Sequence, residues 1–195
     1  SFAPAAATLT VRKIYRLLQI RDLTKDTYVI RFDRNGMAFR AGQHITLGMP
    51  GNNQVREYSI YSTEQDPALE VLIREVESGT VSRQLRKLIA GELLDVDGPF
   101  GYFTLDEKQL HREHLFDSTG TGIAPIQSMD SSCPGLNYTV LHGVRYRHEA
   151  HERDDRNRCR ESLHRELPVQ SRGVAGGRPV PATDEAVPLF AGRIE

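Results

Sequence analysis

The stretch that decides the fold is Ser118-Thr119-Gly120-Thr121-Gly122-Ile123-Ala124-Pro125. It lies between a weak strand pattern at residues 114–118 and a helix expected from about residue 123, and a buried strand pattern follows at residues 136–142. A strand, a glycine-rich turn, a helix and a second strand in this order are typical of an open α/β domain. The sequence therefore predicts that such a domain begins close to residue 107.

The residues before this stretch follow a different pattern. Short apolar or alternating runs separated by polar turns predict strands, and one helix is expected at residues 81–89. Many short strands with a single helix favour a small antiparallel barrel. We therefore expect two domains, an antiparallel β-barrel at residues 1–106 and an α/β domain at residues 107–195. The expected strands of the barrel lie at residues 9–19, 27–32, 43–47, 56–62, 69–76 and 93–96.

The composition excludes several classes of protein. The 195 residues are 38% hydrophobic and 26% charged with a net charge of −1, so no overall field favours nucleic acid or an anionic membrane. No apolar run reaches the length of a membrane span, and the first seven residues lack the pattern of a signal peptide. The two cysteines provide neither a disulfide framework nor the four ligands of an iron–sulfur cluster. We expect a cytoplasmic monomer without a metal site.

The pattern weakens after Tyr146. Residues 147–195 contain one aromatic residue, Phe190, and few large aliphatic residues. Residues 148–165 are dense in charge, and residues 171–188 are rich in glycine, proline and alanine. This composition does not predict a buried core. We therefore expect the second domain to be truncated or atypical after about residue 146.

Arg56-Glu57-Tyr58-Ser59 is the first candidate binding motif. On a strand, Arg56 and Tyr58 point to the same side. An arginine can make a bidentate contact with a diphosphate, and a tyrosine beside it can stack on a planar ring. Ser59 offers a hydroxyl to a polar ring atom. The alternative for the motif alone is a solvent-exposed strand with an Arg–Glu pair.

Two further turns carry glycine ahead of a helix. Gly79-Thr80-Val81-Ser82 opens the helix of the barrel, where free N–H groups can bind a phosphate, although Thr80 or Ser82 can equally act as an ordinary N-cap. Gly120 and Gly122 form the second turn, which lets a pyrophosphate approach backbone amides, and the alternative there is a plain strand–helix turn. Arg145 follows the next strand, at the sheet edge that binds ligands in open α/β folds.

The motifs together resemble the ferredoxin–NADP reductase family in its bacterial branch, over residues 9–146. The resemblance implies a barrel that binds FAD and an α/β domain that binds NADP(H). The matching stretches are Phe39-Arg40-Ala41-Gly42-Gln43, Arg56-Glu57-Tyr58-Ser59, the 69–76 strand with Gly79-Thr80-Val81-Ser82, Gly98-Pro99-Phe100-Gly101, and the turn from Thr119 to Pro125.

The resemblance also implies roles for individual residues. The catalytic positions would be Ser59, near the flavin N5 edge, and Tyr58, stacked on the flavin. Thr121 would approach the flavin from the second domain. Gly120, Gly122 and Arg145 would place the nucleotide. The residues implied to bind FAD are Arg56, Glu57, Tyr58, Ser59, Leu72, Ile73, Arg74, Thr80, Val81 and Ser82.

Arg160-Glu161-Ser162 resembles the family stretch whose arginine grips the 2′-phosphate of NADP. An Arg–phosphate contact contributes about 1.5–3 kcal/mol, which is enough to favour NADP over NAD by ten-fold or more. The alternative for Arg160 is a solvated side chain in an arginine-rich chain. Arg193, in a similar Gly-Arg-aliphatic stretch, is expected to be such a side chain.

Three features depart from the family pattern. Asp117 stands in the strand before the glycine turn, where a buried carboxylate would need a partner. Thirteen residues separate Tyr146 from Arg160, fewer than the family uses for a helix and a strand. The chain stops soon after Arg193, so we expect a C-terminal part that is truncated, wrongly read, or a variant lacking half of this domain.

The function implied by the resemblance is a reductase. We expect an enzyme that transfers a hydride from NADPH to FAD and passes single electrons to ferredoxin or flavodoxin, which are small acidic carriers. One alternative is the reductase component of an oxygenase that uses NADH. Another is a flavin-binding relay module without full NADPH turnover.

Overall fold

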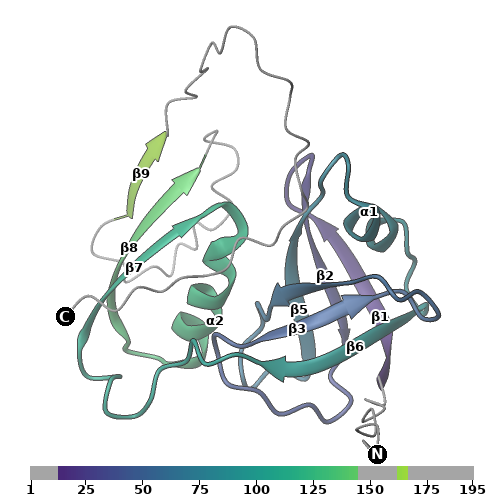
Figure 1. Cartoon of the computed structure of the whole chain (residues 1–195). Coiled ribbons are helices and arrows are strands. Elements are labelled where there is room, and N and C mark those ends of the chain that lie inside the picture. The colour runs from purple at the N-terminus through teal and green to yellow at the C-terminus, as the bar shows by residue number, and fades with distance from the viewer. Residues whose placement is uncertain (1–12, 145–161, 167–195) are drawn as a thin grey trace, which may run out of the picture.

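The computed structural model describes residues 13–144 together with the backbone of residues 162–166 (Figure 1). The described residues form a six-stranded antiparallel sheet and a three-stranded parallel sheet. No helix in this part of the chain is long and apolar enough to cross a membrane.

The six-stranded sheet has the order β4-β3-β6-β1-β2-β5, with every neighbouring pair antiparallel. Its two edge strands, β4 and β5, meet at a bridge between Ile60 and Val71, which curls the sheet into a barrel. The expected antiparallel barrel is thereby confirmed. The strands are β1 (Lys13–Asp22), β2 (Thr27–Asp33), β3 (His44–Gly48), β4 (Val55–Ser59), β5 (Ala68–Arg74) and β6 (Leu93–Phe100).

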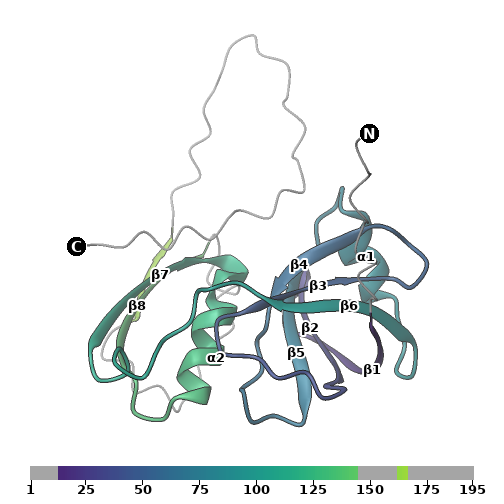
Figure 2. The same cartoon turned by 60° about the horizontal axis from the view of Figure 1, so that its bottom comes forward.

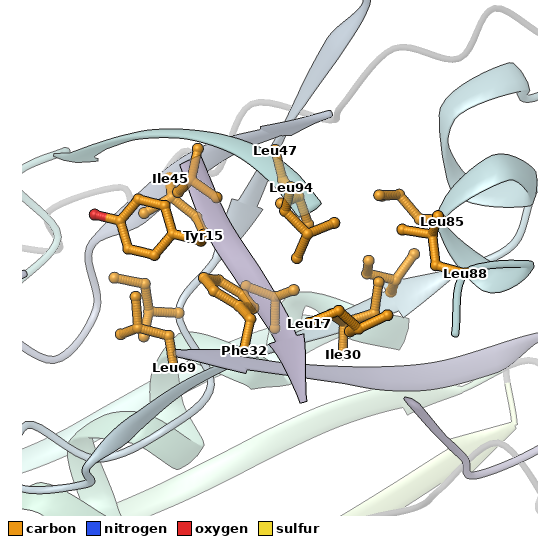
Figure 3. Close-up of a cluster of buried hydrophobic side chains, with 14 of the residues drawn as sticks. Tyr15, Leu17, Ile30, Phe32, Ile45, Leu47, Leu69, Leu85, Leu88 and Leu94 are labelled. Atoms are coloured by element: carbon orange, nitrogen blue, oxygen red, sulfur yellow. The ribbon is translucent and has the colours of Figure 1, made fainter. Parts of the chain in front are cut away.

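The barrel core is built from alternate residues of these strands. In β1, Tyr15 and Leu17 are buried while their neighbours are exposed, as the two-residue period of a strand requires. Figure 3 shows these side chains meeting Phe32 from β2 and Leu94 from β6. The helix α1 (Thr80–Arg86) adds Val81 and Leu85 to the same cluster, so it covers one end of the barrel.

The parallel sheet follows the order β7-β8-β9, formed by Glu113–Thr119, Asn137–Val144 and Ser162–Glu166. A 3₁₀ turn, η1 (Gly120–Ile123), leads from β7 into the helix α2 (Ala124–Ser132). Pro125 stands in the first turn of α2, where its missing N–H has no consequence. The strand–turn–helix–strand order was predicted. The domain boundary at residue 107 and the extent of the second domain stay predictions, because residues 145–161 and 167–195 lie outside the described part.

The helix α2 joins the two sheets (Figure 2). A second apolar cluster takes Ala41 and Leu72 from the barrel side and Met129 from α2, together with residues of β7 and β8. The Ser128 hydroxyl, which is fully buried, donates to the carbonyl oxygen of Ser62 at 2.7 Å. The Ser132 hydroxyl accepts a hydrogen bond from the Glu64 N–H at 3.0 Å. Apolar burial and two hydrogen bonds therefore fix α2 against the barrel.

Several element boundaries differ from the sequence expectations. The strand β6 continues to Phe100 rather than ending at Val96, because its last residues pair with β3 as far as His44. The strand β4 ends at Ser59, since the chain then crosses to β5 through the Ile60 bridge. The predicted start of β1 at residue 9 lies outside the described residues. Asp117 is exposed on β7, so it needs no buried partner.

Close packing between the barrel and α2 requires a glycine at position 42. Its φ is +96°, and a Cβ there would collide with the Phe103 carbonyl oxygen and with Met129 Cε of α2. We predict that Gly42→Ala destabilises the fold by roughly 2–6 kcal/mol, from about 1–3 for backbone strain and about 1–3 for overpacking. Chemical denaturation measures this loss.

Gly36→Ala is the matched control. Gly36 also has a positive φ, +73°, but a Cβ there meets no atom within 4 Å. We expect it to destabilise by only about 1–2 kcal/mol, the strain of the left-handed conformation. Equal losses for the two variants would contradict the packing explanation.

Candidate functional site

The candidate site lies where the two edge strands of the barrel separate. Besides the Ile60–Val71 bridge, the Tyr61 N–H donates to the Glu70 carbonyl oxygen at 2.8 Å. In the described part of the chain β4 and β5 are not neighbours in the strand order, so their edges are not paired with each other beyond this end. Backbone groups on such edges need solvent or a ligand as partner.

The side chains of β4 alternate between the two faces of the sheet. Tyr58 pairs with Ile45 and Arg56 pairs with Leu47, so both lie on the face of the core residues. Tyr58 packs partly against the core, and Arg56 is half-buried. The structure therefore brings Arg56 and Tyr58 to one face, as the strand period predicted.

Ser59 and Glu57 lie on the other face of β4. Ser59 pairs with His44 and is half-buried, at the end of the strand. The Glu57 side chain is exposed, with its carboxylate 3.9 Å from His44 Nε2. Glu57 thus points away from Arg56 and Tyr58, so its carboxylate does not face the phosphate group predicted for that side.

The three predicted residues of β5 have different surroundings. Leu72 packs with Ile123 in the cluster that joins the sheets. Ile73 is fully buried in the barrel core, so it can offer a ligand only its backbone. Arg74 forms an ion pair with Asp26 at 3.2 Å. The pKa of the Asp26 carboxyl is lowered although burial opposes the shift, because Thr24 donates a hydrogen bond to it and Arg74 is close.

The helix α1 follows β5 in the chain, and the hydrogen bond between the Val76 N–H and the Ser82 hydroxyl places its first turn close to the end of β5. Gly79 is the N-cap, no side chain caps the turn, and the turn contains no acidic residue. The suggestion that Thr80 or Ser82 caps the helix is therefore wrong. Thr80 is exposed, while the Val81 side chain is buried in the core. An N-terminal turn without a capping side chain or an acidic residue of its own suits an anion.

Ser82 is instead part of the support beneath this turn. Its hydroxyl accepts a hydrogen bond from the Val76 N–H at 3.3 Å, and its carbonyl oxygen accepts one from the Tyr28 hydroxyl. Burial is the main reason that the pKa of the Tyr28 phenol lies far above its ordinary value. Tyr28 therefore stays a neutral donor, and it ties α1 to β2.

Arg86 supports the same helix from its other end. Its guanidinium donates to Glu75 and to Asp22, each at 2.9 Å, and lies 5.3 Å from the centre of the Tyr28 ring. These contacts connect α1 to β1 and to the end of β5. Sequence reasoning missed Tyr28 and Arg86, because their partners are distant in the chain and no local motif marks them.

The glycine turn lies on the second sheet, against β5. Ile123 of η1 packs with Leu72 in the second apolar cluster, which joins the two sheets. Gly120, Thr121 and Gly122 are half-buried. No side chain caps the turn at Thr119. His142, which the sequence did not assign, places its Nε2 2.9 Å from the Gly120 carbonyl oxygen. Arg145 and Arg160 lie outside the described residues.

The groups that the structure brings together favour one kind of ligand. Arg56, Tyr58 and Ser59 lie on the edge strand β4. The uncapped first turn of α1 follows the other edge strand, β5. Such a set suits a molecule with a planar ring and a phosphate group. No cluster of His, Cys, Asp and Glu side chains that could hold a metal ion occurs among the described residues.

Comparison with known proteins identifies residues 15–105 as matching the family described as "Oxidoreductase FAD-binding domain". Ferredoxin–NADP reductase B from Sorangium cellulosum is 33% identical over 150 residues, covering 72% of this chain and 61% of that protein. The toluate 1,2-dioxygenase electron transfer component from Pseudomonas putida is 33% identical over 114 residues, covering 56% of this chain and 33% of that protein. The chain thus spans less than two thirds of the length of either relative.

The fold has solved counterparts. A ferredoxin–NADP reductase from Neisseria gonorrhoeae, crystallised with FAD and NADP, superposes with a TM-score of 0.64 over 71% of this chain and 59% of that chain. At 23% identity this likeness concerns the fold. The architecture of the described residues therefore recurs in solved flavoprotein structures.

The support for α1 can be tested by removing one hydroxyl. Tyr28→Phe removes the hydroxyl that donates to the buried carbonyl oxygen of Ser82, and we expect a loss of about 1 kcal/mol in the free energy of unfolding. Tyr102→Phe is the matched control, because the Tyr102 side chain is 100% exposed. Thermal and urea unfolding measure both variants, and a Tyr28→Phe protein as stable as the control would contradict this role.

Proposed function

Because residues 15–105 match the oxidoreductase FAD-binding family and the chain is similar to a ferredoxin–NADP reductase, we propose that it belongs to the ferredoxin–NADP reductase family. It would then be an FAD-dependent enzyme that oxidises NADPH and reduces ferredoxin or flavodoxin. The observation that supports this most is the placement of Arg56, Tyr58 and Ser59 on the barrel edge that separates from β5. Bound FAD would supply the capacity to accept a hydride and to release electrons singly. We propose a cytoplasmic monomer, with residues 1–106 as the flavin domain and residues 107–195 as the nucleotide domain.

The residues of the barrel would hold FAD by complementary contacts. Arg56 would pair with the diphosphate, and Tyr58 would stack on the ring system. The backbone N–H groups of Thr80, Val81 and Ser82 would bind a phosphate oxygen, which their freedom from a capping side chain supports. Leu72, Ile73 and Arg74 would line the edge of β5, with Ile73 contributing its backbone.

The residues near flavin N5, the reacting atom, would orient the flavin rather than exchange protons with it. Ser59 would donate a hydrogen bond close to flavin N5, and Thr121 would approach from η1. Gly120 and Gly122 would let the pyrophosphate of the nucleotide reach backbone amides. Arg145 and Arg160 complete the proposed nucleotide contacts.

A second candidate function is the reductase component of an oxygenase with NADH as donor. The similarity to the toluate dioxygenase electron transfer component favours it. The two functions share the flavin site and differ in the nucleotide and in the acceptor. Anaerobic reduction of the bound flavin by each nucleotide therefore separates them.

The nucleotide preference depends on the arginine proposed to bind the 2′-phosphate. We predict that NADPH reduces the flavin at least about ten-fold more efficiently than NADH, and that Arg160→Ala removes this difference by weakening NADPH alone. Arg112→Ala, at an exposed arginine, is the control and should change neither value. Faster reduction by NADH in the unmodified protein, unaffected by Arg160→Ala, would support the oxygenase reductase instead.

Ser59 offers a test of the reacting end of the site. We predict that Ser59→Ala slows flavin reduction by about ten-fold or more, equivalent to about 1.4 kcal/mol, while FAD affinity changes far less. Ser59→Thr keeps a hydroxyl and should retain more of the rate. Stopped-flow reduction and FAD titration measure the two effects, and an unchanged rate in Ser59→Ala would remove the serine from this role.

A further inference from the structure

A buried histidine lies directly beneath the glycine turn. His142 is on β8, 6% exposed, and pairs in register with Ser118 on β7. Its Nε2 lies 2.9 Å from the carbonyl oxygen of Gly120, the first residue of η1. We propose that His142 is a positioning residue that fixes the Gly120–Gly122 turn in the shape that receives the nucleotide.

The chemistry of the contact fixes the state of the ring. A carbonyl oxygen can only accept a hydrogen bond, so the Nε2 atom of His142 must carry the proton. The side chain therefore acts as a donor to the backbone of the turn. The bond spans 22 residues in sequence and connects the end of one strand to the turn that follows its neighbour.

The turn needs such an anchor because packing at its first residue is open. Gly120 has a φ of +51°, and a Cβ there would meet no atom within 4 Å. A Cβ on Gly122 would lie 3.9 Å from the Cβ of Ser118, so this part of the turn stands over β7. The buried Ser118 hydroxyl has no hydrogen-bond partner among the described residues. His142 therefore provides the directional bond to the backbone of the turn.

The consequence for binding rests on the proposed function. Amides that are already held in place lose less freedom when a pyrophosphate binds, so a fixed turn binds more tightly than a loose one. Loss of the His142 bond should weaken nucleotide binding and leave the FAD contacts of the barrel residues unchanged, because no barrel residue takes part in that bond.

The experiment compares His142→Leu, His142→Gln and a matched control, His114→Leu. His114 lies on β7 of the same sheet, and its Nε2 is 2.8 Å from a backbone carbonyl oxygen, that of Gln109, away from the turn. Hydrogen–deuterium exchange follows the amides of residues 120–123 without nucleotide, and calorimetry measures the Kd of NADP⁺. If His142→Leu does not fold, His142→Phe replaces it, because it also lacks a donor.

We expect His142→Leu to speed amide exchange in the turn and to raise the Kd of NADP⁺, each by about two- to ten-fold. His142→Gln should restore both toward the parent values, because its amide can donate to the same oxygen. His114→Leu should change neither. Exchange and Kd in His142→Leu equal to those of the parent, or no rescue by glutamine, would overturn the proposal. If the parent itself does not bind NADP⁺, the proposed function fails, and the exchange data alone decide whether His142 anchors the turn.

Discussion

The edge strands of the barrel meet at Ile60 and Val71 and then separate, and the candidate site depends on that separation. A fully closed barrel would pair the backbone of β4 with that of β5 and leave no edge for a ligand. Here the separation leaves Arg56 and Tyr58 half-buried at an open edge, near an uncapped helix turn. The same barrel that builds the apolar core thereby creates a polar site at its side.

The second sheet gains its position from α2. Because α2 packs on both sheets and bonds to the barrel through Ser128, η1 is held against β5. The two proposed binding regions, the β4–β5 edge and the glycine turn, are thus parts of one packed unit. The proposed transfer between two cofactors bound at these regions would require them to be held close together, since reacting atoms must approach to within about 3–3.5 Å.

Local patterns in the sequence were sufficient to place the strands of the barrel, the common face of Arg56 and Tyr58, and the glycine turn, because a two-residue period and glycine spacing act over short distances. They did not predict β9. Local patterns were insufficient where the role of a residue or the end of a strand depends on a partner that is distant in the sequence. Ser82 looks like a helix cap, yet it is buried and its hydroxyl accepts the Val76 N–H, while its carbonyl oxygen accepts a hydrogen bond from the hydroxyl of Tyr28, 54 residues away. The continuation of β6 to Phe100 likewise depends on pairing with β3. The roles of Arg145 and Arg160 stay predictions.

We propose that FAD binds where the edges of β4 and β5 separate beyond the Ile60–Val71 bridge. The most direct measurement is the visible absorption spectrum of the purified protein, followed by identification of the flavin that it releases on denaturation. We expect a flavin spectrum and the release of FAD, or the uptake of FAD when it is added to protein purified without it. A protein that carries no flavin and does not bind added FAD would rule out a flavin site at this edge of the barrel.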